Sequence, residues 1–353
     1  MLYVSCIVSI LLLSHIAEKR ENRFFLFLCA FILSLFCGLR GVKTGVDTMN
    51  YYTFMSYIRE SGISFGSDIG FSVISYGMMG IFNNPYYPLL IFAFITNFLI
   101  VFRLWDFRKE ASMMVMLLIY MTMYYPYTFN IVRQFLAISI VFWGTRYLER
   151  GEYIQYIVLN ILASTIHTSS LLGFVFLLVA FECDRKRYKV IGYLLVIMLI
   201  FIGGLVFNKN IIKYEQYFFM SNFSIHGVTI LKIICFIFAI SLEKVFRNSE
   251  FSISKYGDPV SMKKCIPIIY AVGLLLTALG MKFTFMNRIG FYFIMFELPF
   301  WGQTVRAKVN SKVYRLIVFL IVGYVLFVTY ISGENADNLF YYHTFLLENN
   351  GGI

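Results

Sequence analysis

The sequence predicts an all-α polytopic membrane protein, and three observations support this fold class. Of 353 residues, 59% are hydrophobic and 14% are charged, whereas soluble domains are about 45–50% apolar and about 25% charged. The apolar residues fall in long segments, and the basic residues fall in short clusters between them. This placement is typical of membrane helices joined by cytoplasmic loops. It explains the net charge of +11 without a nucleic-acid partner.

Ten apolar segments are the candidate transmembrane helices of a single integral membrane domain, residues 1–353. Several are shorter than the roughly 20 residues of a straight span, which tilted or kinked helices packed on neighbours would explain. The first segment lacks a preceding basic region, so we interpret it as a retained span rather than a signal peptide. The ten segments are residues 2–16, 24–39, 86–105, 111–126, 130–148, 190–207, 228–246, 265–281, 289–301 and 315–332.

Two further apolar stretches fit a full span less well. Ile69–Phe82 is short and contains three glycines, so we expect an interfacial helix. Tyr153–Phe181 begins and ends at basic loops and has a polar middle, Ser164 to Ser170. We expect this stretch to form a re-entrant or short helical hairpin, with His167 near its outer tip.

The basic clusters set the orientation of the chain. Most Lys and Arg residues lie in the loops that would share one side of the membrane, and the positive-inside rule makes that side cytoplasmic. Ten spans then place both termini outside. The external face would be built from outer loops 40–70 and 208–227 and from an outer tail, 333–353.

Three arginines on different helices fall outside the cytoplasmic clusters, all near the predicted outer surface. Arg40 ends the second span, Arg133 lies just inside the fifth, and Arg288 precedes the ninth. Guanidinium groups bind phosphate in a bidentate manner and stay charged when partly dehydrated. The three would therefore form a shared anion site. Alternatively, each extends to lipid headgroups or pairs with a carboxylate.

Two residues are candidates for a general base. Asp47 follows the turn-forming Gly41 and Gly45, and it would act either as the N-cap of a short helix or as a carboxylate beside Arg40. His167 is the histidine at membrane depth. It is either a buried, hydrogen-bonded side chain or a base that titrates near neutral pH.

Several catalytic patterns are absent from the sequence. It has no GxxxxGK[ST], HExxH or GxSxG motif, and no DxD pair of the kind used in metal-assisted sugar-nucleotide transfer. We therefore expect no metal and no cofactor, and a substrate that already carries its leaving group.

Four patterns in order resemble the Wzy-type polysaccharide repeat-unit polymerases, in their EpsG-like branch. Order and spacing agree from the first arginine to the histidine, and the last 180 residues agree mainly in topology. Asn287-Arg288 fits more loosely. The patterns are Arg40-Gly41 with Thr44-Gly45-Val46-Asp47-Thr48-Met49-Asn50-Tyr51-Tyr52, then Asp68-Ile69-Gly70-Phe71, Asn130-Ile131-Val132-Arg133-Gln134-Phe135-Leu136-Ala137, and Ala163-Ser164-Thr165-Ile166-His167-Thr168-Ser169.

The resemblance implies a metal-independent membrane glycosyltransferase, an O-antigen or exopolysaccharide polymerase. It would polymerise undecaprenyl-diphosphate-linked oligosaccharides at the outer face of the bacterial inner membrane, among membrane lipid. A chain-length regulator and a flippase of the same pathway would be its partners. On this basis Arg40, Arg133 and Arg288 bind the diphosphate and His167 or Asp47 is the base. The glycan would contact Asn50, Tyr51, Tyr52, Asn130 and Gln134.

Two other functions remain open at this stage. A flippase for the same lipid-linked unit would carry charges through the midplane and some repeat symmetry, but only Lys232 lies deeper than the outer rim. A membrane-bound O-acyltransferase also uses a histidine in an apolar stretch. Its donor would have to enter from the cytoplasm, whereas His167 is expected to face outward.

Overall fold

A computed structural model describes residues 2–63, 68–182, 227–246, 265–306, 311–326 and 342–348. These residues are largely helical, and the only β pairing among them is an isolated bridge between Arg40 and Thr344. The predicted all-α class is thus confirmed. The expected span 190–207 lies outside the described residues, as do nearly all of the loop 208–227 and most of the tail 333–353.

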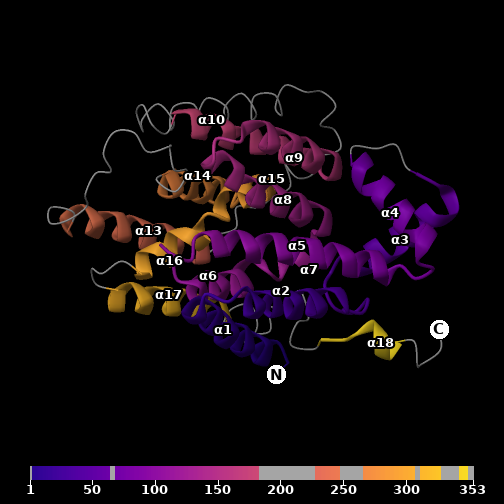
Figure 1. Cartoon of the computed structure of the whole chain (residues 1–353), viewed down its shortest axis with the longest axis horizontal. Helices are drawn as coiled ribbons and strands as arrows, with labels where there is room; N and C mark the ends of the chain where they lie inside the picture. Colours follow the sequence, from indigo (N-terminus) through magenta and orange to yellow (C-terminus); the bar gives the residue numbers. More distant parts are fainter. Residues whose placement is uncertain are drawn as a thin grey trace.

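Four long helices form the centre of the molecule and run roughly along its long axis (Figure 1). The four are α1 (Leu2–Arg20), α2 (Arg23–Gly38), α5 (Tyr86–Asp106) and α8 (Val132–Glu149), and the shorter α9 (Tyr153–Ile166) follows them. The pairs α1–α2, α2–α5, α5–α8 and α8–α9 pack together.

The two ends of this bundle carry different elements and residues. One end carries α3 (Thr48–Ser61), α4 (Ile69–Ile81) and α18 (Phe345–Glu348), at the right of Figure 1, and we call it the α3–α4 end. At the opposite end, which we call the basic end, Arg103 pairs with Glu149 at 2.6 Å and Arg306 with Glu18 at 2.6 Å.

The expected helical hairpin is present. After α9 the chain turns at His167, continues through the 3-10 helix η2 (Thr168–Gly173) and returns as α10 (Phe174–Glu182). The Tyr156 hydroxyl of α9 donates to the Gly173 carbonyl at 2.5 Å, which holds the two arms together.

Several expected spans are interrupted helices. Residues 111–126 form α6 (Met113–Ile119) and the π-helix η1 (Tyr120–Tyr124), with the short α7 (Tyr127–Asn130) following. The expectation of one helix over 289–301 is wrong, because α15 (Thr284–Ile294) ends and α16 (Glu297–Arg306) begins within it. Pro299 explains the interruption, since it has no N–H for the Met295 carbonyl and its ring would clash there.

Two of the described helices, α1 and α5, are long and apolar enough to cross a membrane, and the other apolar helices have 10–17 residues. A total of about ten spans therefore remains a prediction. The remaining helices are α13 (Gly227–Phe246), α14 (Ile266–Leu279) and α17 (Ser311–Leu326).

Long apolar side chains on the outer helices are exposed and point away from the protein. They include Leu2, Val8 and Leu12 of α1, Ile154, Val158 and Ile161 of α9, Ile230, Ile234 and Ile237 of α13, and Leu316, Phe319 and Leu320 of α17.

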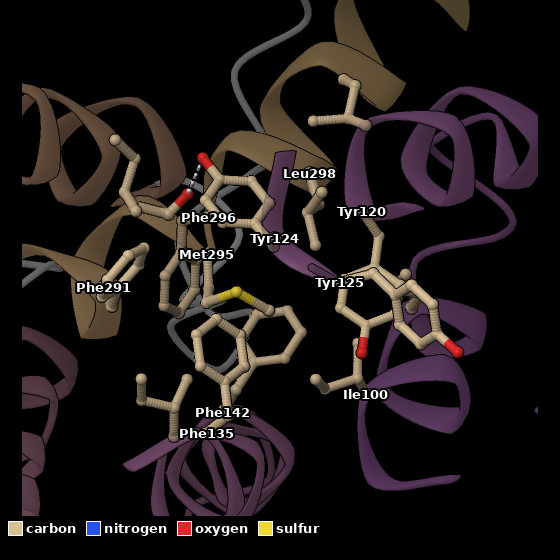
Figure 2. Packing of buried hydrophobic residues seen from close by; sticks show 14 of the residues in the cluster. Ile100, Tyr120, Tyr124, Tyr125, Phe135, Phe142, Phe291, Met295, Phe296 and Leu298 are labelled. Atoms are coloured by element: carbon tan, nitrogen blue, oxygen red, sulfur yellow. Dashed lines mark hydrogen bonds between the residues drawn. The ribbon is translucent and has the colours of Figure 1, made fainter. Parts of the chain in front are cut away.

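An aromatic part of the hydrophobic core lies where α8, η1 and α15–α16 meet (Figure 2). The Phe135 and Phe291 rings meet at 5.5 Å and hold α15 against the first half of α8. The Phe142 and Phe296 rings meet edge to face at 5.4 Å and hold the turn after α15 against the second half of α8.

A segment near the C-terminus docks on the α3–α4 end. Tyr342 stacks on Phe36 at 4.3 Å, and the Gly41 amide donates to the His343 carbonyl at 2.8 Å. Phe345 stacks on Tyr86 at 4.3 Å. The C-terminal segment thereby holds the loop between α2 and α3 in place.

Candidate functional site

The site is organised around the first turn of α8, at the α3–α4 end. This helix begins after Ile131, whose side chain makes no capping hydrogen bond, and the Arg133 amide of the first turn donates to the Tyr51 hydroxyl at 3.5 Å. Three neighbouring residues reach three other elements. Asn130 Oδ1 lies 3.4 Å from the Asp47 amide, Arg133 bonds Asp68 before α4, and Gln134 Nε2 donates to the Arg288 carbonyl of α15 at 2.6 Å.

Asp68 is the centre of the polar contacts. Its Oδ2 accepts from Arg133 Nη1 at 3.1 Å and lies 3.2 Å from His167 Nδ1. Its Oδ1 accepts from the Thr168 amide at 3.2 Å and lies 3.4 Å from the Thr168 hydroxyl. The Asp68 side chain is 9% exposed, so one buried carboxylate joins α4, α8 and the tip of the α9–α10 hairpin.

The surroundings of Asp68 favour its charged form. Burial would raise the pKa of this carboxyl, but the hydrogen bonds from His167 and the Thr168 amide and the positive charge of Arg133 outweigh burial. The pKa of Asp68 is therefore lowered from its ordinary value. The carboxylate remains ionised at neutral pH.

His167 is positioned to act as a base. It ends α9 in an extended conformation (φ −152°), which turns its ring toward Asp68, and its side chain is 27% exposed. A carboxylate at Nδ1 favours the tautomer with the proton on Nδ1 and leaves Nε2 as the acceptor. Among the described residues, no protein group bonds Nε2.

A glycine allows the carboxylate to reach the histidine. A Cβ on Gly70 would lie 2.2 Å from Thr165 Oγ1 and 2.7 Å from Thr165 Cβ. Only a residue without a side chain lets α4 approach α9 this closely. Asp68, two residues before Gly70, therefore lies beside His167, two residues after Thr165.

Of the three expected arginines, Arg133 has its side chain at this site, and Arg288 is tied to it through its backbone carbonyl. The Arg133 side chain is 44% exposed, lies over the Phe71 ring at 5.7 Å and uses one nitrogen on Asp68. Arg288 is exposed on α15, and its carbonyl is bonded to the residue after Arg133. Arg133 also bonds the Tyr51 side chain, and with five N–H donors its guanidinium keeps others for an anion. The Arg288 side chain makes no hydrogen bond or ion pair among the described residues.

Arg40 has different surroundings. It is 1% exposed, and its Nε donates to the Thr48 hydroxyl at 3.0 Å. Its Nη1 donates to the Cys37 carbonyl at 2.7 Å and its Nη2 to the Phe129 carbonyl at 3.2 Å. In this structure Arg40 anchors the loop between α2 and α3, and its guanidinium is bonded within the protein. A diphosphate site shared by Arg40, Arg133 and Arg288 stays a prediction.

The other expected site residues of the loop and of α3 make contacts within the protein. Asp47 precedes α3 without capping it, and its carboxylate accepts from Asn50 Nδ2 at 3.1 Å rather than pairing with Arg40. The Tyr51 hydroxyl lies 3.5 Å from the Arg133 amide. Tyr52 packs on the ring of Tyr86, 5.1 Å away.

Gln134 is 3% exposed, and its amide is engaged by the Arg288 carbonyl. We therefore assign it to holding α15 against α8.

No group of three His, Cys, Asp or Glu residues that could hold a metal ion occurs in the part of the chain that the structure describes. A metal-independent reaction stays a prediction.

Asp68 is the site residue that sequence reasoning omitted. It belongs to the pattern Asp68-Ile69-Gly70-Phe71 of the sequence, and that pattern is the signal from which it could have been identified. The acidic residue carries the charge, the glycine allows the close helix approach, and Phe71 lies under Arg133.

The model of the EpsG family matches residues 23–344, nearly the whole chain. No curated protein and no solved structure matches the chain.

Proposed function

This chain belongs to the EpsG family, and from that premise we propose that it polymerises undecaprenyl-diphosphate-linked oligosaccharide repeat units. EpsG-like proteins are Wzy-type polysaccharide polymerases of membranes. The proposed reaction takes place at the outer face of the bacterial inner membrane, in O-antigen or other surface polysaccharide synthesis. The growing glycan on its lipid diphosphate is the donor, and a hydroxyl of a new lipid-linked repeat is the acceptor.

The contact between Asp68, His167 and Arg133 is the observation that carries the proposal. His167 Nε2 takes the proton of the acceptor hydroxyl, while Asp68 holds the ring and stabilises the imidazolium that forms. The acceptor oxygen bonds to the anomeric carbon. The bond from that carbon to the diphosphate oxygen breaks, and the diphosphate keeps the electron pair.

Arg133 and Arg288 bind the departing diphosphate in this mechanism. Negative charge grows on the leaving oxygen as the bond breaks, and fixed guanidinium donors stabilise that charge without reorganising. The positive end of the α8 dipole lies at the same place, because Arg133 is in the first turn of that helix. Since Asp68 pairs with one Arg133 nitrogen, it fixes both the base and one anion-binding group.

The remaining residues serve the glycan and the loop. Asn50 is exposed at the start of α3, and Tyr51 is partly buried beside Arg133; we assign both to the glycan, with Asn130. Arg40 and Asp47 shape the loop that presents them. The reaction needs no metal or cofactor in this scheme, because the diphosphate is already a good leaving group. A flippase would supply the lipid-linked units before this reaction, and a chain-length regulator would act together with the polymerase.

The test is the glycan phenotype of a deletion strain complemented with variants. We expect Arg133→Ala and His167→Ala to give single-repeat glycan in place of a ladder, with normal protein levels. Arg20→Ala, an exposed arginine at the basic end, is the matched control and should restore the ladder. Ladders in both site variants would exclude this site, and repeat units stranded in the cytoplasm of the deletion strain would indicate a flippase instead.

A further inference from the structure

A second polar cluster lies inside the bundle, away from the candidate site. Lys232 of α13 and Glu297 of α16 are 7% and 1% exposed and pair at 2.7 Å. The Tyr124 and Tyr270 hydroxyls both donate to the Glu297 carboxylate, Tyr270 at 3.0 Å. Charged groups in the interior of a membrane protein are costly and are usually retained for function. The proposed mechanism uses none of these four residues.

The cluster joins the two sides of the break between α15 and α16. Glu297 is the first residue of α16, and the Tyr124 hydroxyl also lies 3.5 Å from the carbonyl of Ile294, the last residue of α15. Figure 2 shows the Tyr124 ring beside Met295 and Phe296, which form the turn. Tyr124 itself ends the π-helix η1, an irregular element common at functional sites.

A glycine presses α14 against the same place. A Cβ on Gly273 would lie 2.7 Å from the Ile294 nitrogen and 2.8 Å from its Cα. Gly273 lies one turn after Tyr270 on α14, so this helix contacts the end of α15 through Gly273 and the start of α16 through Tyr270. Backbone contact on one side and the ion pair on the other therefore fix where α15 ends.

The same helix carries residues of the candidate site. Arg288 lies six residues before Ile294, about 9 Å along the helix. The Tyr292 hydroxyl lies 3.0 Å from the Ser169 hydroxyl, two residues from His167. A displacement at the end of α15 would therefore move an anion-binding arginine and the support of the base together.

We propose that Lys232 and Glu297 form a positioning pair for the glycosyl transfer. The pair fixes the end of α15, and through that helix it sets Arg288 and the Tyr292–Ser169 contact relative to His167. This inference rests on the proposed function. It differs from a merely stabilising role, because a buried ion pair is often replaceable by uncharged side chains without loss of stability.

The experiment compares purified variants on lipid-linked repeat units extracted from a strain that lacks the polymerase. Lys232→Met/Glu297→Gln removes both charges and keeps an acceptor for the tyrosine hydroxyls. We expect it to fold, with a thermal midpoint close to wild type, and to polymerise about 10- to 100-fold more slowly. Glu18→Gln/Arg306→Gln, at the other end of α16, is the matched control and should keep the wild-type rate.

A double-mutant cycle identifies the route of action. Adding Arg288→Ala to Lys232→Met/Glu297→Gln should lower the rate little further, because both changes remove the same interaction with the leaving group. Independent, multiplying losses would overturn the proposal, as would a wild-type rate in either parent variant. If the double variant does not fold, Tyr270→Phe removes one hydroxyl from Glu297, and an unchanged rate there would overturn it too.

The two proposals fail in different ways. Full activity in Arg133→Ala and His167→Ala would reject the proposed site, whatever the buried pair does. Loss of activity in those variants together with a wild-type rate in Lys232→Met/Glu297→Gln would reject only the positioning pair.

Discussion

At the scale of single residues, the charge of Asp68 makes stability depend on pH. Its pKa is lowered, so its ionised form stabilises the folded chain at pH values above the ordinary carboxyl range. That contribution is lost as the pH falls through the lowered value. We expect Asp68→Asn to melt below wild type at about pH 6. The difference between the two thermal midpoints should vanish as the pH falls below the lowered pKa of Asp68. Parallel melting curves across this range would contradict the assigned interactions.

Arg40 and Arg133 should differ in what their removal affects. Arg40→Ala leaves the Cys37 and Phe129 carbonyls without their donor in a buried place, which typically destabilises by about 1–3 kcal/mol. Arg133 is 44% exposed, so Arg133→Ala should keep its thermal midpoint within a few degrees while the glycan ladder is lost. Melting curves and ladders from the same preparations check this. If the Arg40→Ala protein has wild-type stability but lacks the ladder, Arg40 binds the diphosphate, as expected from the sequence.

At the scale of elements, the distance between α4 and α9 controls the site. A methyl group at Gly70 would overlap Thr165, and overpacking of this kind costs about 1–3 kcal/mol. Since the helices must separate, Gly70→Ala should lower the polymerisation rate by more than its stability loss explains. Gly77→Ala on the same helix is the control, because no atom lies within 4 Å of its Cβ position. Equal rates in the two variants would contradict the role of Gly70.

The sequence predicted elements better than it predicted contacts. Apolar runs and polar interruptions located most helices, and the polar middle of 153–181 indicated the hairpin that turns at His167. The break at Met295 was missed although Pro299 signals it. The Asp68–His167 contact joins residues 99 apart in the chain and depends on the approach of two helices. The burial of Arg40 was equally hidden, because two of its acceptors are backbone carbonyls.

At the scale of the whole molecule, the clusters of Lys and Arg lie at one end of the bundle and the candidate site lies at the other. The turns after α1, α5 and α8 and the end of α16 carry the clustered arginines and lysines, whereas the candidate site lies at the α3–α4 end (Figure 1). Loops rich in Lys and Arg remain cytoplasmic during membrane insertion. The polymerase mechanism requires the same arrangement, because its lipid-linked substrates are used at the outer face.

Thiol labelling in intact cells tests this orientation directly. Glu60 of α3 and Lys109 after α5 are both exposed and lie at opposite ends of the bundle. We expect a membrane-impermeant maleimide to label Glu60→Cys in intact cells and Lys109→Cys only after permeabilisation. The wild-type chain gives the background from its own cysteines. Labelling in the reverse order would place Asp68, His167 and Arg133 in the cytoplasm, where an exported lipid-linked acceptor could not reach them.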